Sequence, residues 1–258
     1  MSAPARLALT RAISPRLVDC ELTHLARTPI DLARAEAQHA AYEAALRGLG
    51  CTVRRVAPAP GHADSVFIED TAVVLDEVAV ITRPGAASRR GEVPAVEAAL
   101  APLRPLARIT DPGTLDGGDV LVAGRRIWIG LTGRTNAAGI AQFRDAVAPH
   151  GYSVQAVPVT GCLHLKTAVT AVDEATVLVN PAWVDPAAFA PLALLAVDPA
   201  EPMGANVLRV GDVLLYADAY PRTLARLRAH GATVTTVDAS ELAKAEGAVT
   251  CCSLVMRG

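Results

Sequence analysis

A cysteine near the C-terminal end of the chain is the strongest candidate nucleophile in this sequence. Cys251 and Cys252 stand side by side in an apolar segment, residues 249–256, that we predict to be the last strand. Successive side chains of a strand point to opposite faces, so only one of the two thiols can face a given site. Two buried core cysteines are the alternative, because free cysteine is often buried. A catalytic role also requires a base, an orienting carboxylate and a substrate pocket.

A histidine and a pair of aspartates are candidates for the base and the orienting carboxylate. His164 stands at the predicted start of a strand, whereas the other five histidines lie in predicted helices or loops without comparable acidic neighbours. Asp116 and Asp119 flank two glycines, which allow the backbone to bend tightly or to approach a ligand closely. A structural histidine and two exposed turn aspartates are the alternative interpretations.

Further charged residues indicate a ligand that carries charges of both signs. Asp64, Glu69 and Asp70 interrupt an otherwise apolar stretch that we predict to be a strand. An acidic pair inside a strand is unusual and favours a site for a cation, although alternation would place Glu69 and Asp70 on opposite faces unless a bulge intervenes. Arg89 and Arg134 offer bidentate contacts to a carboxylate, with exposed surface arginines as the alternative.

The charge balance and the missing motifs exclude several classes of function. The 258 residues include 24 Lys and Arg against 26 Asp and Glu, a formal net charge of −2, and no basic run. This balance argues against nucleic-acid binding and against a membrane-surface helix. The longest apolar run, residues 187–197, is too short to cross a bilayer. No phosphate loop, dinucleotide fingerprint, zinc-protease motif or serine-hydrolase motif occurs, and the Cys and His spacing fits no structural zinc site.

The cysteine count indicates the cellular compartment. Five cysteines are an odd number, they form no Cys-x-x-Cys pair, and no export signal precedes them. We therefore expect reduced thiols in a cytoplasmic protein.

The elements that must position these residues are hairpins and helices in alternation. Four segments show two apolar stretches around an acidic or glycine-containing turn: residues 66–83, 119–131, 165–180 and 206–217, with turns at 76–77, 124–125, 173–174 and 211–212. Stretches rich in Ala, Leu and Arg predict helices over residues 29–48, 92–103, 136–148, 186–195 and 221–230. Thr28 as N-cap and Pro29 at the first helical position mark the start of the first helix.

The candidate residues recur at a near-regular interval. Glu69, Asp116, His164, Asn206 and Cys251 are separated by 47, 48, 42 and 45 residues. Such a period is typical of repeat architectures. It predicts five strand-rich α/β units in one domain, residues 1–258, closed into a ring by pairing of the first strand, residues 7–13, with the last. The ring would place these five side chains around one centre. A mixed α/β sheet with hairpins that recur by chance is the alternative.

Short motifs follow one another at compatible spacings along nearly the whole chain. They are Phe67-Ile68-Glu69-Asp70, Thr82-Arg83-Pro84-Gly85-Ala86, Ser88-Arg89-Arg90, Thr114-Leu115-Asp116-Gly117-Gly118-Asp119-Val120-Leu121, Gly130-Leu131 with Arg134-Thr135-Asn136, Leu163-His164-Leu165-Lys166, and Leu242 with Thr250-Cys251-Cys252-Ser253. Together they resemble the dimethylarginine dimethylaminohydrolase (dimethylargininase) family of the guanidino-group-modifying, or pentein, superfamily. The resemblance implies a five-unit ββαβ-type α/β propeller, in agreement with the observed period.

The resemblance also implies a role for each candidate residue. Cys251 would be the nucleophile, His164 the general acid and base, and Asp116 the carboxylate of the triad. The guanidinium and α-amino groups of the substrate would contact Asp64, Glu69 and Asp70. The α-carboxylate would contact Arg89 and Arg134. Two further residues, Leu22 and Ala245, would contact the substrate largely through their backbone.

The implied activity is hydrolysis of asymmetric dimethylarginine or monomethylarginine to citrulline and an alkylamine. The resemblance implies that this reaction needs no cofactor, although Zn²⁺ could inhibit the enzyme by binding at Cys251. It is compatible with either a monomer or a homodimer. The alternatives are an arginine deiminase, which we expect to be longer, and a non-catalytic propeller that binds a partner. Two departures from the family pattern concern substrate preference: Gly133 replaces a longer polar residue, and Glu246 precedes Gly247 where Asp is usual.

Overall fold

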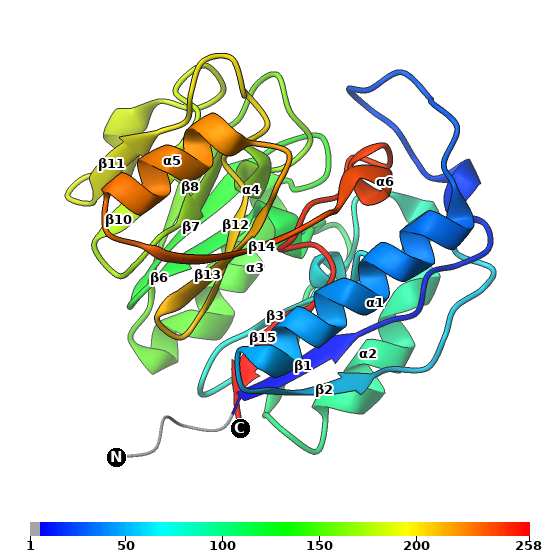
Figure 1. The fold of residues 1–258 in the computed structure, drawn as a ribbon. Coiled ribbons are helices and arrows are strands. Elements are labelled where there is room, and N and C mark those ends of the chain that lie inside the picture. Colours follow the sequence, from blue (N-terminus) through cyan, green and yellow to red (C-terminus); the bar gives the residue numbers. More distant parts are fainter. Residues whose placement is uncertain (1–5) are drawn as a thin grey trace.

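Five small sheets make up the fold of the computed structural model, which describes residues 6–258 (Figure 1). Each sheet has three strands, of which the first two are antiparallel and the third runs parallel to the second. This repeated unit confirms the predicted ββαβ-type propeller. That the ring forms a single domain remains a prediction.

The units follow one another along the chain. The first unit contains β3 (Ala72–Val74), β4 (Ala79–Ile81), α2 (Val93–Leu100) and β5 (Leu106–Arg108). The second contains β6 (Val120–Ala123), β7 (Arg126–Leu131), α3 (Ala137–Val147) and β8 (Ser153–Pro158). The third contains β9 (Val169–Ala171), β10 (Thr176–Val179), a 3₁₀ helix (Pro186–Phe189) and β11 (Ala193–Ala196). The fourth contains β12 (Val207–Val210), β13 (Val213–Ala217), α5 (Pro221–Ala229) and β14 (Thr233–Val237). The fifth contains β15 (Leu254–Arg257), β1 (Arg6–Thr10), α1 (Leu32–Gly48) and β2 (Cys51–Arg55).

The fifth unit closes the ring because it combines the two ends of the chain. β1 pairs antiparallel with β15, with Leu9 opposite Leu254 and Leu7 opposite Met256, as predicted. All four predicted hairpins are also present with their turns at the predicted positions. Gly124 and Gly211 have φ angles of 59° and 67° in two of these turns, a conformation that glycine adopts without steric cost.

The hydrophobic core is divided into five clusters, each built from two neighbouring units. Leu9 and Leu254 of the fifth unit, for example, share a cluster with Ile81 and Val96 of the first. The other clusters join the first unit to the second, the second to the third, the third to the fourth and the fourth to the fifth. Because no unit buries its apolar face alone, the ring is stabilised as a whole. None of the helices in residues 6–258 is both long and apolar enough to cross a membrane.

Two predicted strand segments prove to be turns. Residues 68–71 form a 3₁₀ helix, and β3 begins only at Ala72. Cys251 and Cys252 lie in a turn before β15, which begins at Leu254. The sequence predicts strands in both segments because a turn that is buried on both sides contains the same run of apolar residues as a buried strand.

Two predicted helices also differ from the structure. The first, α1, begins at Leu32 because the Asp31 side chain accepts a hydrogen bond from the backbone N–H of Arg34 and caps the helix there. The predicted helix over residues 186–195 is only a 3₁₀ turn, Pro186–Phe189. Pro191 cannot donate a helical hydrogen bond, and β11 pairs in parallel with β10 beyond it.

A close approach of two backbones at the ring centre explains one of the glycines in the Asp-Gly-Gly-Asp motif. A Cβ atom on Gly117 would lie 2.0 Å from the carbonyl oxygen of Glu69, so this segment could pack only by moving away. We expect Gly117→Ala to lower the free energy of unfolding by at least 1–3 kcal/mol, the usual cost of overpacking.

Chemical denaturation measures this loss, and Gly61→Ala is the matched control. A Cβ atom on Gly61 would meet no atom within 4 Å, so the control should change the free energy of unfolding by less than about 0.5 kcal/mol. Equal stability of the two variants would contradict the close approach.

Candidate active site

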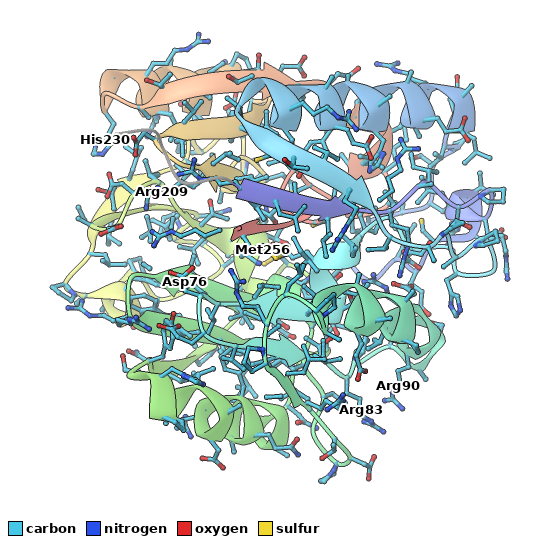
Figure 2. All side chains as sticks on the ribbon, turned by 90° about the horizontal axis from the view of Figure 1, so that it is seen from below. Asp76, Arg83, Arg90, Arg209, His230 and Met256 are labelled. Atoms are coloured by element: carbon cyan, nitrogen blue, oxygen red, sulfur yellow. The ribbon has the colours of Figure 1, made fainter. Side chains whose placement is uncertain are left out.

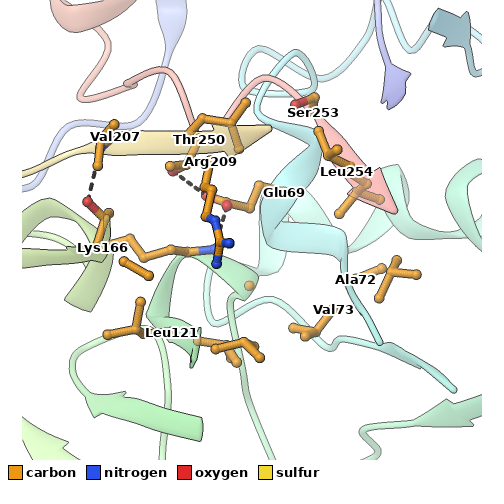
Figure 3. A pocket seen from close by; sticks show the side chains of 18 residues that line it. Glu69, Ala72, Val73, Leu121, Lys166, Val207, Arg209, Thr250, Ser253 and Leu254 are labelled. Atoms are coloured by element: carbon orange, nitrogen blue, oxygen red, sulfur yellow. Dashed lines mark hydrogen bonds and ion pairs between the residues drawn. The ribbon is translucent and has the colours of Figure 1, made fainter. Parts of the chain in front are cut away.

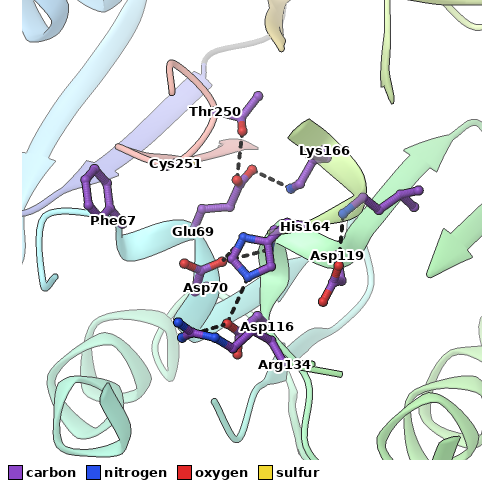
Figure 4. A network of polar contacts seen from close by, with 12 residues as sticks. Phe67, Glu69, Asp70, Asp116, Asp119, Arg134, His164, Lys166, Thr250 and Cys251 are labelled. Carbon is purple, nitrogen blue, oxygen red and sulfur yellow. Dashed lines mark hydrogen bonds and ion pairs between the residues drawn. The ribbon is translucent and has the colours of Figure 1, made fainter. Parts of the chain in front are cut away.

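The centre of the ring receives one polar segment from each unit, just before that unit's first strand. Asp70 lies in the 3₁₀ helix before β3, Asp116 precedes a 3₁₀ helix (Gly117–Asp119) before β6, and His164 precedes the short helix α4 (Leu165–Ala168) before β9. Asn206 and Cys251 occupy the equivalent places before β12 and β15. Glu69, which the predicted period named for the first unit, directly precedes Asp70. Figure 4 shows Glu69, Asp116, His164 and Cys251 gathered at the centre of the ring.

His164 lies between two buried carboxylates (Figure 4). Its Nε2 atom is 3.0 Å from Oδ2 of Asp116, and its Nδ1 atom is 4.0 Å from Oδ1 of Asp70. Burial favours the neutral imidazole, but Asp70, the hydrogen bond to Asp116 and the nearby Asp119 outweigh it and raise the pKa of His164 to about 9. At neutral pH the imidazole is therefore protonated and can donate from both nitrogens.

The two carboxylates are fixed by backbone amides. Oδ1 of Asp116 accepts a hydrogen bond from the N–H of Gly85 at 2.9 Å, and Oδ1 of Asp70 accepts one from the N–H of Gly118 at 2.9 Å. Burial favours the neutral acid of Asp70, but His164 and Arg89 outweigh it and lower the pKa of Asp70 to about 2. Asp70 therefore stays negatively charged in a buried place.

Asp119 has a structural role that the sequence reasoning did not assign. Its carboxylate accepts hydrogen bonds from the N–H of Leu165 at 2.9 Å and from the hydroxyls of Thr132 and Thr135 at 2.8 and 2.6 Å. Burial raises the pKa of Asp119 to about 6. Because Leu165 directly follows His164, these contacts hold the turn that carries the imidazole. The only available signal was the second aspartate of the Asp-Gly-Gly-Asp motif.

The two adjacent cysteines have different surroundings. Cys251 is a half-buried residue that lines a pocket together with His164, and its sulfur accepts a long hydrogen bond from the N–H of Ala248 at 3.4 Å. Cys252 is fully buried in the apolar cluster between the fourth and fifth units. Only one of the two cysteines lines the pocket, but the predicted strand alternation is not the reason, because both residues lie in a turn. Burial, followed by the charges of Glu69 and Asp70, raises the pKa of Cys251 to about 12.

The pocket at Cys251 is small and contains acidic and basic side chains. Of the predicted substrate-binding residues it is lined by Asp64, Asp70, Arg89, Arg134 and Ala245; its other lining residues are Glu21, Phe67, Leu163, His164, Glu246, Gly247 and Cys251. Leu22 is not among them, although its neighbour Glu21 is, and its side chain packs against the core. Burial raises the pKa of Asp64 to about 6, and one oxygen of its carboxylate accepts from the N–H of Glu21 at 3.2 Å.

Glu69 borders a different cavity of the ring centre (Figure 3). Its carboxylate pairs with the ammonium group of Lys166 and accepts from the hydroxyl of Thr250 at 2.8 Å. Arg209 lines the same cavity. On the far side the ring opens between hairpin turns, where Asp76, Arg209 and Met256 line the mouth (Figure 2). A direct contact between Glu69 and a substrate at Cys251 therefore stays a prediction without support from this arrangement.

The two predicted carboxylate-binding arginines are also not equivalent. Arg89 is buried; its Nη1 atom binds Asp70, its Nη2 and Nε atoms bind Glu92 at 2.9 and 3.2 Å, and Nη2 also donates to two backbone carbonyls. Arg134 has only long side-chain contacts from its guanidinium group: Nη2 lies 3.4 Å from the hydroxyl of Thr23 and 3.8 Å from the carboxylate of Glu21, and Nη1 lies 4.0 Å from Asp116. Arg134 is therefore the arginine that is available to a new anionic partner.

One trio of side chains could ligate a cation. Among residues 6–258, one donor atom each of Asp70, Asp116 and His164 lie within 4.8 Å of one another. The thiol of Cys251 does not belong to this trio. Inhibition by Zn²⁺ at Cys251 therefore stays a prediction.

Sequence comparison identifies close relatives over the whole chain. The chain is 44% identical over 256 residues to an N(G),N(G)-dimethylarginine dimethylaminohydrolase of Streptomyces coelicolor, and the match covers 98% of both chains. It is 34% identical over 226 residues to the protein of the same name from Pseudomonas aeruginosa, which covers 87% of this chain and 89% of the relative. No protein-family model matches the chain.

Solved structures agree with the sequence relatives. A cysteine-to-serine variant of the Pseudomonas aeruginosa enzyme, crystallised with citrulline, superposes with a TM-score of 0.91 at 32% identity and covers 98% of this chain and 100% of that one. The N-terminal domain of a cyanobacterial arginine dihydrolase shares the fold, with a TM-score of 0.84 at 20% identity. With this fold, this ring of polar residues and these relatives, the chain belongs to the dimethylarginine dimethylaminohydrolase family.

Proposed function

We propose that this protein hydrolyses N-methylated arginines to citrulline and an alkylamine through a covalent intermediate on Cys251. One observation carries the proposal: the half-buried Cys251 and a protonated His164, paired with Asp116, line the same pocket as carboxylates that suit a cation. The relatives' names and the citrulline in one of their structures support the substrate class.

Charge complementarity orients the substrate in this proposal. Asp70 and Asp64 attract the guanidinium and α-amino groups, and Arg134 attracts the α-carboxylate. Arg89 acts on binding through Asp70, whose carboxylate it holds. The guanidinium carbon is a poor electrophile because its charge is delocalised, so the substrate must be held in place against the sulfur before attack.

The nucleophile is generated only in the presence of the substrate. The raised pKa of Cys251 keeps its sulfur protonated in the free site, and the cation beside it stabilises the thiolate. The thiol proton leaves to solvent, and the thiolate then forms a C–S bond to the guanidinium carbon. Cys251 thus attacks only when a positively charged group occupies the pocket.

His164 then moves a proton in each of the two half-reactions. Its imidazolium protonates the departing amine as the C–N bond breaks, which leaves a thiouronium intermediate on Cys251. The neutral imidazole next removes one proton from water, whose oxygen attacks the same carbon. The C–S bond then breaks, the remaining hydroxyl proton passes to the sulfur, and citrulline leaves with Cys251 restored as a thiol. Asp116 holds the imidazole in place and stabilises its charged form.

The reaction as written needs no cofactor. We further propose a cytoplasmic location, which five free cysteines in the described chain support. Assembly into a homodimer stays a prediction.

The direct test compares substrates and cysteine variants. We expect citrulline release from asymmetric dimethylarginine and monomethylarginine with a higher kcat/KM than from arginine. Cys251→Ser should reduce kcat by more than about 10³-fold, because the hydroxyl is a much weaker nucleophile. The matched control, Cys252→Ser, changes a thiol that is buried away from the pocket and should retain activity within a few-fold.

Mass spectrometry of the quenched reaction should place the covalent adduct on Cys251. An adduct on Cys252, or preference for arginine over both methylated forms, would contradict the proposal; the second result would favour an arginine deiminase.

The unequal contacts of the two arginines generate a second prediction. Arg134→Ala should raise KM with a smaller fall in kcat, and loss of about 2–4 kcal/mol in binding corresponds to roughly 30- to 1000-fold in kcat/KM. A methylated alkylguanidine without a carboxylate should react poorly with the wild type and should lose little more with Arg134→Ala.

The exposed Arg144 on the outer helix α3 provides the control, since Arg144→Ala should leave both substrates unaffected. Equal losses on both substrates in Arg134→Ala would show a general defect and would remove Arg134 from carboxylate binding.

A further inference from the structure

A segment without regular structure covers the pocket at Cys251. This covering segment, residues 21–27, contributes Glu21 to the pocket that contains His164, and His24 and Leu25 to a second, more apolar cavity that shares Cys251 as a wall. Leu22, which the family resemblance assigns to substrate contact, lies in the same segment. The position of the covering segment therefore determines the shape of both cavities.

The covering segment has almost no hydrogen bonds of its own. Between residues 21 and 30 the described chain forms no backbone–backbone hydrogen bond. Arg27 ties the end of the segment to the preceding loop by donating to the carbonyls of Val18 and Cys20 at 2.7 and 2.6 Å. Such a segment needs external partners to keep one conformation, because each ordered residue loses backbone entropy.

The start of the covering segment contacts three other side chains, those of Asp64, Ser88 and Arg134. Glu246 supplies the partners of the central backbone amides of the segment. Its Oε2 atom accepts from the N–H of Thr23 at 3.1 Å, and its Oε1 atom accepts from the N–H groups of His24 and Leu25 at 2.5 and 2.7 Å. Three consecutive backbone amides thus converge on one carboxylate. Hydrogen bonds to a charged acceptor are stronger than those between neutral groups.

The backbone around Glu246 is held in an unusual conformation. Glu246 has a φ angle of 58°, and it is the only residue other than glycine with a positive φ in the described part of the chain. This left-handed conformation is sterically unfavourable for a side chain with a Cβ atom. Gly247 follows, where a Cβ atom would lie 2.1 Å from the Phe67 ring. The turn therefore fixes the direction of the Glu246 side chain toward the covering segment.

We propose that Glu246 is a positioning residue, whose carboxylate holds the covering segment over the pocket and so prepares the site to bind substrate. The inference rests on the proposed function for its kinetic part. Without these three hydrogen bonds the segment must be ordered when substrate binds, and the lost entropy reduces affinity. The chemical steps at Cys251 and His164 are affected less, because Glu246 does not contact either reacting group through its carboxylate.

The test combines kinetics with limited proteolysis. Glu246→Ala should raise KM for a methylated arginine about tenfold or more with a smaller change in kcat. The same substitution should also accelerate cleavage by trypsin after Arg27, which mass spectrometry of the fragments would detect. Glu246→Gln keeps one acceptor oxygen and should lie between wild type and Glu246→Ala in both measurements.

Glu201 provides a matched control because its carboxylate also accepts from consecutive backbone amides, those of Arg222 and Thr223 at 2.9 and 2.7 Å, outside the pocket at Cys251. Glu201→Ala should lower stability but leave KM and cleavage after Arg27 unchanged. The inference is overturned if both Glu246 variants keep the wild-type KM and cleavage rate, or if they change only in parallel with Glu201→Ala. Failure of the wild type to release citrulline would overturn the proposed function instead. The proteolysis would still test whether Glu246 holds the covering segment in place.

Discussion

The burial of several like charges in one small volume is the constraint on which this structure depends. Asp70, Asp116 and Asp119 approach one another at the ring centre, and carboxylates in that position remain ionised only if each has compensating partners. His164 and Arg89 provide the positive charges, while backbone amides and two threonine hydroxyls provide the remaining hydrogen bonds. Because these partners come from the first three units, those units must pack together before the site exists.

The same charges act on the protonation of the nucleophile. Burial of the sulfur, together with the negative charges that keep His164 protonated, keeps Cys251 as a neutral thiol, so a proton donor is ready but the nucleophile is not. A cationic ligand in the pocket stabilises the thiolate at the sulfur, because an opposite charge nearby favours the charged form of a group. The enzyme therefore selects a cationic substrate partly through activation of the nucleophile, and not only through its contacts with the rest of the substrate.

The sequence predicted the parts of the fold that local chemistry determines. Turn residues and alternating apolar runs specify the hairpins, and their spacing correctly indicated a ring with one polar residue from each unit. Patterns of this kind do not reveal tertiary pairing. Glu69 finds Lys166 across 97 residues, and Arg89 is buried because Glu92 and Asp70 surround it. Likewise the tight turns at residues 68–71 and 251–252 follow from close packing at the ring centre and not from local preference.

The central claim, that Cys251 is a neutral thiol until a cation binds, is tested most directly by the pH dependence of its alkylation. The rate of reaction of ligand-free protein with neutral iodoacetamide, mapped to Cys251 by mass spectrometry, should rise about tenfold per pH unit between pH 6 and 9.5 without reaching a plateau, because the thiolate fraction grows at that rate below the pKa of about 12. A plateau that begins near neutral pH in the ligand-free protein would show a preformed thiolate and contradict this account.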